Sequence, residues 1–227
     1  MGNVMFMRKG EVHTAPVNGI PLSDLVEGQV VMIKENGIAV PFYLAKHNYE
    51  SGLNGNGRTL LVRKDCYDTR EMLSSSGYSA VLYTESTLDP WLNNEYKLLL
   101  DSTIQEAMST TSFYCTTASG VGVLERPVFI LSLTEFGVTQ SGCEVEGSVL
   151  PIAETLRVAY LNGSTTIQLT RTVGKNWANA FASLNKSGNI YATSAGNTAG
   201  SRPCFTLPSV MLVESEPNAD GSVNLKA

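Results

Sequence analysis

Charged residues and histidines are scarce in this chain. Asp, Glu, Lys and Arg together make up 16% of the 227 residues, and there are two histidines, whereas charged residues form about a quarter of an average domain. His13 lies in a segment rich in proline and glycine, and His47 follows an apolar run. Neither has another histidine or a cysteine at the spacing of a metal site. We therefore expect no metal site built on histidine.

Motifs of catalysis and of cofactor binding are also missing. The sequence has no Gly-x-Ser-x-Gly turn, no Walker phosphate loop and no His-Glu-x-x-His pair. Its four cysteines are widely spaced, which indicates free or buried thiols made in a reducing compartment and not a disulfide frame or a zinc site. They are Cys66, Cys115, Cys143 and Cys204. We predict a protein without enzymatic activity, metal or cofactor.

Signals for membranes, secretion and nucleic acids are weak. No run of about 18 apolar residues could form a membrane span, and the first residues lack the apolar core of a signal peptide. Phe6 stands where N-myristoylation requires Ser or Thr. The net charge is −5, and the basic residues are not clustered as in nucleic-acid readers. We expect neither membrane insertion nor nucleic-acid binding.

Acidic residues are absent from positions 155–213. This stretch carries a charge of +5, which leaves −10 for the rest of the chain. Its basic residues are Arg157, Arg171, Lys175, Lys186 and Arg202. Such a surface could attract an acidic partner.

Within the acid-free stretch, residues 172–200 are crowded with Asn, Ser, Gly and Thr, among which Trp177, Phe181 and Tyr191 are interspersed. Rigid aromatic residues on a background of Ser, Gly and Asn are typical of a binding surface such as an antibody paratope. Composition alone also fits a plain surface loop. The flanking segments favour the binding surface, because Leu169–Arg171 and residues 200–209 frame the stretch, and we interpret Arg171 and residues 200–208 as scaffold.

Length and pattern predict one α+β domain with strands first, helices in the middle and a hairpin-rich C-terminal third. Asn36-Gly37 between two apolar runs predicts a hairpin of residues 30–34 and 38–46. We expect further strands at 59–64, 113–116, 127–133, 180–184, 190–193 and 204–207, with a turn at 186–189. Helical spacing predicts helices at 86–100, 102–108 and 152–161.

Two other clusters each allow two interpretations. Two carboxylates among Asp65, Asp68 and Glu71 could act as acid and base, but the basic residues between them favour a surface ion-pair network. Glu216-Pro217-Asn218 resembles a calcium and sugar motif of mannose-type lectins, yet no Trp-Asn-Asp follows, and we interpret it as coincidence.

Arg202 and the two tryptophans also allow a structural or a functional interpretation. Arg202 either binds an anion or ties a turn to carbonyl or carboxylate oxygens, and the second is the commoner role. Trp91 lies on a helical apolar face and is predicted to be in the core. Trp177 lies among small polar residues, where it could anchor a ligand.

Three segments together resemble a family of uncharacterised domains in phages and prophages of gut Firmicutes. They are Arg58-Thr-Leu-Leu-Val-Arg-Lys-Asp65, Ser86-Thr-Leu-Asp-Pro-Trp-Leu-Asn93 and Pro127-Val-Phe-Ile-Leu-Ser-Leu-Thr-Glu135. Residues 152–163, Leu169–Arg171 and 200–208 continue the match, which extends from about Val30 to Ser209. Members often carry Trp-x-Arg-Ser-Pro where this chain has Leu169-Thr-Arg-Thr-Val173, which leaves the shape of the following stretch open.

Members of that family resemble the C-type-lectin-like fold shared by relatives of the formylglycine-generating enzyme and by the variable proteins of diversity-generating retroelements. The resemblance implies a lectin-like domain at 30–213 with a variable ligand face at 172–198. Residues 1–29 would form a docking segment and 214–227 a C-terminal tail. The expected ligand-binding residues are Thr172, Lys175, Asn176, Trp177, Asn179, Phe181, Ser183, Asn185, Asn189, Tyr191, Thr193 and Asn197.

The function implied by the resemblance is that of a phage virion protein, in the tail or a surface fibre, made in the cytoplasm of the bacterial host. It would bind a host cell-surface protein or glycan, contact other virion proteins and form a homo-oligomer, a trimer by analogy with tail proteins. One alternative is a head or tail decoration protein without a host ligand. Another is an enzyme related to the formylglycine-generating group, for which the cysteines lack a reactive setting.

Overall fold

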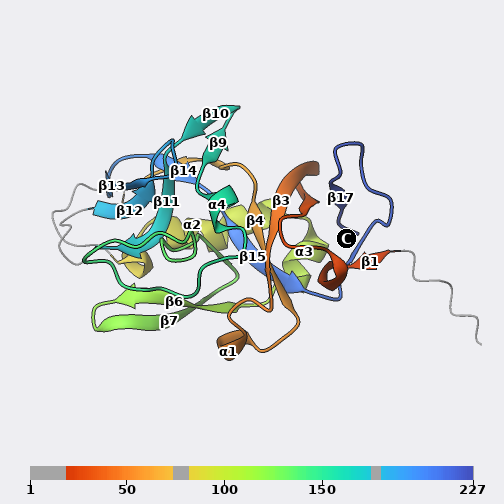
Figure 1. The fold of residues 1–227 in the computed structure, drawn as a ribbon, viewed down its shortest axis with the longest axis horizontal. Coiled ribbons are helices and arrows are strands. Elements are labelled where there is room, and N and C mark those ends of the chain that lie inside the picture. The colour runs from red at the N-terminus through yellow and green to blue at the C-terminus, as the bar shows by residue number, and fades with distance from the viewer. Residues whose placement is uncertain (1–18, 74–81, 175–179, 227) are drawn as a thin grey trace, which may run out of the picture.

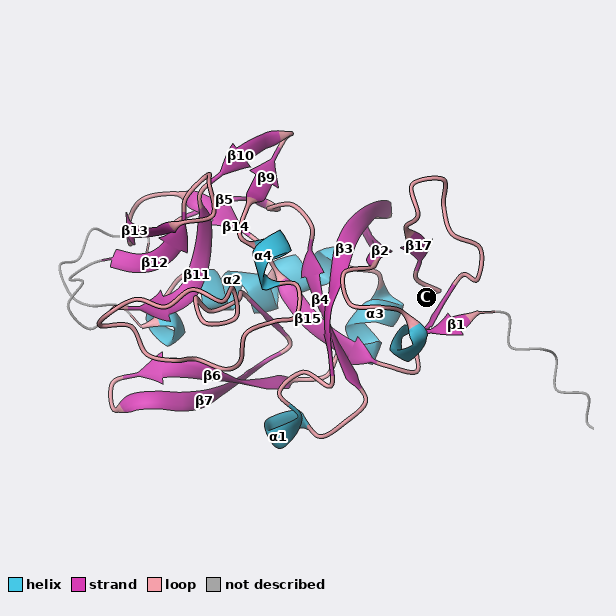
Figure 2. Ribbon diagram, in the orientation of Figure 1, coloured by secondary structure: helices cyan, strands magenta, loops and turns pink. Residues whose placement is uncertain are grey.

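The structure, a computed structural model, describes residues 19–73, 82–174 and 180–226. It is a mixed α+β fold built mostly of β-sheet, and one of its sheets is curled into a half barrel. Figure 2 shows short helices distributed among many strands. The α+β class predicted from the sequence is confirmed.

The curled sheet has six strands in the order β17-β2-β3-β4-β15-β8. Neighbours are antiparallel except β17, which runs parallel to β2. The strands are β2 (Val30–Glu35), β3 (Ile38–His47), β4 (Arg58–Arg63), β8 (Val128–Phe129), β15 (Cys204–Pro208) and β17 (Val223–Asn224). Asn36 and Gly37 join β2 to β3 with φ angles of 52° and 76°, as a type I′ turn requires, and the predicted hairpin is confirmed.

The centre of this sheet is apolar. Leu60, Leu61 and Val62 of β4 are all fully buried, and a continuous apolar run is typical of a strand covered on both faces. The Phe42 ring packs on the Phe205 ring, with centroids 5.3 Å apart. The helices, all short, are α1 (Ser51–Asn54), α2 (Leu88–Asn94), α3 (Ser102–Ala107) and α4 (Ala153–Leu156), with 3-10 turns η1 (Leu22–Asp24), η2 (Tyr83–Glu85) and η3 (Tyr96–Leu99).

A second sheet of five strands has the order β13-β12-β11-β14-β5. Its strands are β5 (Asp68–Arg70), β11 (Gln168–Val173), β12 (Ala180–Leu184), β13 (Ile190–Ser194) and β14 (Ala199–Ser201). Three smaller pairs complete the fold: β1 (Ile20–Pro21) with β16 (Leu212–Val213), β6 (Thr111–Thr117) with β7 (Gly120–Arg126), and β9 (Ala159–Leu161) with β10 (Ser164–Thr166). Figure 1 places β12, β13 and the β6–β7 ribbon at one end of the molecule and β1 and β17 at the other.

The helix predicted at 86–100 is broken in two. It ends at Asn94, and η3 follows after Glu95. The break turns the buried Tyr96 side chain toward the first sheet, where its hydroxyl donates to Glu35 Oε2 at 2.7 Å. A tertiary contact has therefore overridden the helical pattern.

The helix predicted at 152–161 was mostly wrong, because α4 ends at Leu156 and residues 159–161 form a strand. Gln168 Nε2 donates to the carbonyl oxygens of Leu156 and Arg157 at 2.9 and 2.7 Å. This side chain therefore takes the place of the backbone N–H donors that a longer helix would supply. Asn162 and Gly163, with φ angles of 51° and 78°, then turn the chain into the β9–β10 hairpin. That Asn-Gly pair was the sequence signal for the hairpin.

Segments expected to lie outside the domain are packed onto it. Ile20 pairs with Val213, and Leu22 is fully buried, so the described part of the docking segment belongs to the domain. Val223 pairs with Val31, and the expected C-terminal tail therefore adds a strand to the curled sheet. Residues 1–18 lie outside the described part of the chain.

Candidate ligand-binding surface

Strand β11, which leads into the expected ligand face, is buried along its whole length although four of its residues are polar. Gln168, Thr170, Arg171 and Thr172 are each fully buried. Buried polar groups are costly unless they are hydrogen-bonded. The expectation that Thr172 contacts a ligand is thus corrected, because its side chain is an interior group.

Arg171 is the centre of this interior. Its Nη1 donates to Glu135 Oε2 at 2.7 Å and to the Ile130 carbonyl oxygen at 2.8 Å, and its Nε donates to the Tyr114 carbonyl oxygen at 2.9 Å. The Tyr49 hydroxyl donates to the other oxygen of Glu135. The scaffold role predicted for Arg171 is confirmed.

The charges around Arg171 keep it ionised. Burial alone would lower the pKa of Arg171, but the negative charge of Glu135 raises that pKa well above its ordinary value. Burial, followed by the charge of Glu135, likewise raises the pKa of Tyr49 well above its ordinary value. The pair is therefore a charged guanidinium on a carboxylate, with a neutral phenol as the second donor to that carboxylate.

Glu146, also fully buried, ties three segments together. Its Oε1 accepts from the backbone N–H and the hydroxyl of Thr116, both at 2.6 Å, and its Oε2 accepts from the Thr172 hydroxyl. Thr172 Oγ1 in turn accepts from the Leu133 N–H at 2.8 Å. The strand predicted at 127–133 is limited to β8, and beyond it the N–H groups of Ser132 and Leu133 donate to the side chains of Glu135 and Thr172.

Arg202 is a second interior arginine. It donates to the carbonyl oxygens of Arg63, Lys64 and Leu156 at 2.6–2.7 Å, which confirms that it ties a turn to backbone carbonyls. Gly200 beside it is required by space, because a Cβ there would lie 2.5 Å from Cys66 Sγ. Since Arg171 and Arg202 are 0% and 3% exposed, the positive surface expected from the acid-free stretch is much reduced.

The β12–β13 hairpin has the register Phe181↔Thr193 and Ser183↔Tyr191, so these four side chains share one face of the sheet. Phe181, Ser183 and Thr193 are at most 4% exposed, whereas Tyr191 is 49% exposed. The Ser183 hydroxyl shares a hydrogen bond with Thr193 Oγ1 and lies 3.1 Å from the Tyr191 carbonyl oxygen. The prediction that Phe181, Ser183 and Thr193 contact a ligand directly is therefore wrong, because these three side chains pack inside the protein.

The turn of this hairpin is held by Asn185. Its Oδ1 accepts from the N–H groups of Ser187 and Asn189 at 2.9 and 3.1 Å, and Gly188 has a φ of 77°. The half-buried Asn185 is therefore a turn residue, while Asn189 is exposed. The predicted turn at 186–189 is confirmed.

The exposed side chains between residues 186 and 198 lie on both faces of the edge strand β13 and in the turns at its two ends, and together we call them the display surface. They are Lys186, Ser187, Asn189, Tyr191, Ala192, Ser194, Asn197 and Thr198. Of the twelve expected ligand-binding residues, Asn189, Tyr191 and Asn197 belong to it. Lys175, Asn176, Trp177 and Asn179 lie outside the described residues. Ala192, Ser194 and Thr198 were missed: Ala192 and Ser194 alternate with Tyr191 along β13 and lie on the opposite face of the sheet, and Thr198 lies in the turn that follows β13.

A cleft of about 370 Å³ opens where β11 ends, between residues 116–120 and Leu82, Val173 and Gly174. Its described lining combines apolar side chains with hydroxyl and backbone groups and has no charged side chain. The cleft lies at the start of the expected ligand face. A neutral ligand with both apolar and polar groups is the kind that such a lining suits.

Other sequence candidates proved structural. Trp91 is 7% exposed, so its core assignment is confirmed, and the Arg70 guanidinium lies 3.6 Å from its ring centroid. Asp68 pairs with Arg70 at 2.8 Å, which agrees with an ion-pair network. Asn218, the last residue of the Glu216-Pro217-Asn218 triplet, uses its side-chain amide within its own loop, where Nδ2 donates to Ser222 Oγ at 2.9 Å.

The thiols are free, with Cys143 half-buried and the other three buried. Burial raises the pKa of Cys66 to about 11 and that of Cys115 to about 12, so neither is an activated nucleophile. Among the described residues no cluster of His, Cys, Asp and Glu is arranged to hold a metal ion. No helix in that same part of the chain is long and apolar enough to cross a membrane.

Sequence reasoning missed Tyr49, Glu135 and Glu146, the acceptors and donors of the interior network. A signal for Glu135 was present, since Ser132-Leu-Thr-Glu135 has the capping-box pattern. The Ser132 N–H donates to Glu135 Oε2 at 2.7 Å and the Glu135 N–H to Ser132 Oγ at 3.2 Å. No local pattern marks Tyr49 or Glu146.

Comparison with known proteins gives one match. Neither the curated proteins nor the solved structures contain a significant match to this chain. Residues 56–209, which include β4, the whole display surface and the interior residues Glu135, Glu146 and Arg171, match a family described as a domain of unknown function. The chain belongs to this family, DUF6273.

Proposed function

We propose that this protein is a non-enzymatic binding module of a phage virion, which recognises a molecule of the host cell surface through the display surface. The observation that carries the binding role is Tyr191. It is an aromatic side chain 49% exposed on an edge strand, and the other members of the display surface, apart from Lys186, are small and neutral. Tyr supplies a large contact area at low entropic cost, and Ser and Asn supply adaptable hydrogen bonds.

The support beneath this surface suits recognition. β13 is held by β12, and β12 by β11, whose side chains are fixed by Glu135, Glu146 and the backbone of β6. A rigid support keeps the exposed side chains in position, which reduces the entropy lost on binding. The same arrangement allows those side chains to change without disturbing the core.

The chemistry of the display surface points to a neutral, polar ligand. Lys186 is its one charged member, and the others offer hydroxyl, amide, methyl and phenol groups. A host glycan or a polar protein surface presents the complementary groups. The neutral cleft beside Val173 and Gly174 extends the same chemistry.

The phage assignment rests on the sequence resemblance. On this proposal the fold is a C-type-lectin-like variant related to the formylglycine-generating enzymes and to the variable proteins of diversity-generating retroelements. The protein lies in a tail or surface fibre, contacts other virion proteins and forms a homo-oligomer. The mixed α+β architecture and the hairpin-rich C-terminal third are consistent with it.

The test is a pull-down of cell-envelope fractions by the full chain. Glycan and protein fractions from gut Firmicutes are presented separately to the wild type, to Tyr191→Ala and to the matched control Tyr160→Ala. Tyr160 is 44% exposed on β9, outside the display surface. We expect Tyr191→Ala to weaken capture at least about tenfold, as for an interface hot spot, and Tyr160→Ala to have no effect.

Equal capture by all three proteins would contradict the role of the display surface. Absence of any capture, combined with defective particles when the gene is deleted from the phage, would favour the decoration role instead. Loss of a catalytic activity after alkylation of the thiols would favour an enzyme.

A further inference from the structure

The two long edges of the β6–β7 ribbon differ in their hydrogen bonding. On the β6 edge, three side chains take the place of a neighbouring strand. Asn54 accepts from the Ser112 N–H at 2.8 Å and donates to the Ser112 carbonyl oxygen at 2.9 Å. Arg171 donates to the Tyr114 carbonyl oxygen, and Glu146 accepts from the Thr116 N–H. The sheet cannot grow on this side.

The β7 edge is open along its middle. Among the described residues, side chains bond the β7 backbone only near its ends, from Thr117 to the Gly120 carbonyl oxygen and from Arg126 to the Glu125 carbonyl oxygen. Among the strands that the structure describes, β6 is the one neighbour of β7. An open edge of this kind is a template for another strand, and a sheet of only two strands is marginal by itself.

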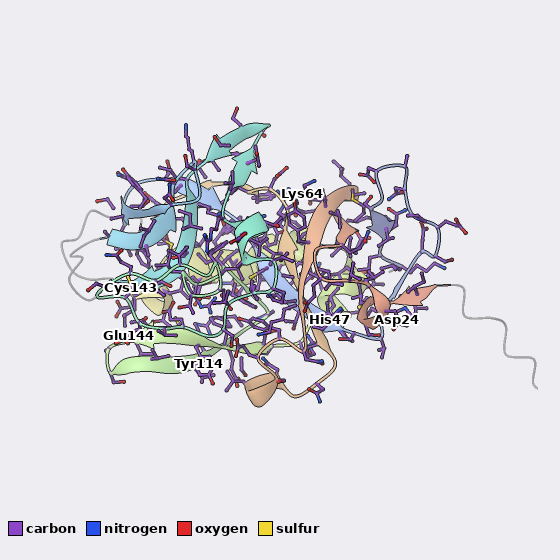
Figure 3. The ribbon with its side chains drawn as sticks, in the orientation of Figure 1. Asp24, His47, Lys64, Tyr114, Cys143 and Glu144 are labelled. Atoms are coloured by element: carbon purple, nitrogen blue, oxygen red, sulfur yellow. The ribbon has the colours of Figure 1, made fainter. Side chains whose placement is uncertain are left out.

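The outward face of β7 is also apolar. Val121 and Val123 are 41% and 51% exposed, and burial alternates regularly along the strand. Tyr114 lies directly opposite Val123 on the same face and is half-buried. Figure 3 shows Tyr114 on this ribbon, with Asp24, His47 and Lys64 well away from it in the view.

We propose that β7 pairs antiparallel with β7 of a second copy of this chain, which joins the two ribbons into one four-stranded sheet around a twofold axis. The sequence of β7 selects the register. Centred on Gly122, the pairing sets Val121 of each copy opposite Val123 of the other and the Glu125 carboxylate opposite the Ser119 hydroxyl. A register centred on Val123 would instead place Glu125 against Val121, and one centred on Glu125 would oppose two like charges.

A second copy fits this edge because the pattern is self-complementary. A twofold contact requires that the same patch match itself, and only the register centred on Gly122 pairs both valines of each copy with valines of the other. This contact does not rest on the proposed function. It would, however, join two display surfaces in one particle, which strengthens binding to a surface with repeated ligands.

The first test is the mass of the full chain in solution by light scattering across a concentration series. We expect twice the monomer mass of 24.4 kDa, and Val123→Lys to raise the dimer dissociation constant at least about tenfold, because the two lysines would lie diagonally across the contact. The matched control is Val210→Lys, at a valine 77% exposed outside the ribbon. Circular dichroism confirms that both variants are folded.

A monomeric or trimeric wild type, or a dimer that Val123→Lys leaves intact, would overturn the proposal. The second test is of the register, in a Cys143→Ser background because Cys143 is the half-buried thiol. Oxidation should cross-link a mixture of the Val121→Cys and Val123→Cys proteins and neither protein alone. No cross-link in the mixture, or equal cross-linking of one variant alone, would overturn the Gly122-centred pairing.

Discussion

Strands β4 and β11 lie inside the two main sheets and are stabilised by opposite means. The middle of β4 is Leu60-Leu-Val62, fully buried and apolar. β11 is buried at all six positions but has Gln168, Thr170, Arg171 and Thr172 among them. Burial of β4 is thus favoured by the transfer of apolar surface from water, whereas burial of β11 depends on hydrogen bonds of its polar side chains.

The difference determines how each strand responds to change. An apolar core tolerates another side chain of similar volume. A buried polar network does not, because each lost partner leaves another buried group unsatisfied. Arg171 alone serves Glu135, Tyr114 and Ile130, which are far from it in sequence. The polar sheet therefore positions the display surface firmly but depends on a few groups.

The largest effect is expected for Arg171→Ala. It leaves the Glu135 carboxylate buried without its cation, which costs about 3–5 kcal/mol of unfolding free energy. Urea denaturation measures the loss. The control is Lys34→Ala, since Lys34 and Asp101 are 3.9 Å apart and side-chain exposure is 63% and 31%; such a pair contributes at most about 1 kcal/mol.

A double variant sharpens this result. Arg171→Met with Glu135→Leu removes both charges, so stability should recover relative to Arg171→Ala. It should stay below wild type, because the Tyr114 and Ile130 carbonyl oxygens lose their donors. If Arg171→Ala cost no more than Lys34→Ala, the polar network would contribute nothing to stability.

The next effect compares conservative changes in the two strands. Leu61→Ala in β4 should cost about 2–5 kcal/mol because it leaves a cavity, whereas Leu61→Met should cost less than about 1.5 kcal/mol. Arg171→Lys keeps the charge but cannot reach three acceptors at once. We expect it to cost more than Leu61→Met by the same denaturation measurement, and the reverse order would contradict the contrast between the sheets.

The same difference explains what the sequence could and could not predict. The apolar run 59–64 and the Asn36-Gly37 turn are local signals, and the strands there were predicted correctly. Arg171 and residues 200–208 were recognised as scaffold from their place in the resemblance. Thr172, Ser183 and Thr193 were taken for surface because small polar residues are usually exposed. Their burial depends on Glu146 and on cross-strand hydroxyl pairs, which no local pattern encodes.

High pH should weaken the fold through its buried tyrosines. Burial is the main cause that raises the pKa of Tyr49, Tyr83 and Tyr96 well above the ordinary value. Stability is therefore fully present below about pH 10, where unfolded tyrosine ionises, and is lost as the pH rises toward the folded values. Denaturation at increasing pH measures the loss of stability. The ultraviolet absorbance of tyrosinate, followed in the same samples, shows at which pH the tyrosines ionise.

Tyr83→Phe is the matched variant for that experiment. The Tyr83 hydroxyl is buried and has no hydrogen-bond partner among the residues that the structure describes, so its removal should leave stability at neutral pH unchanged or slightly higher. The alkaline loss should become smaller. An unchanged alkaline profile would show that Tyr83 ionises without unfolding.

The smallest effects are expected on the display surface itself. Tyr191→Ala and Asn197→Ser should change the unfolding free energy by less than about 0.5 kcal/mol, as exposed positions do. Phe181→Ala, two residues away across the same hairpin face, should cost about 3–5 kcal/mol because Phe181 is 1% exposed. Thermal melts of the three variants make the comparison. A large loss for Tyr191→Ala would mean that its ring supports the sheet, and reduced ligand capture by that variant would then no longer indicate a binding contact. A small loss keeps stability and recognition separate along one strand, which is the property that a surface tolerant of sequence change requires.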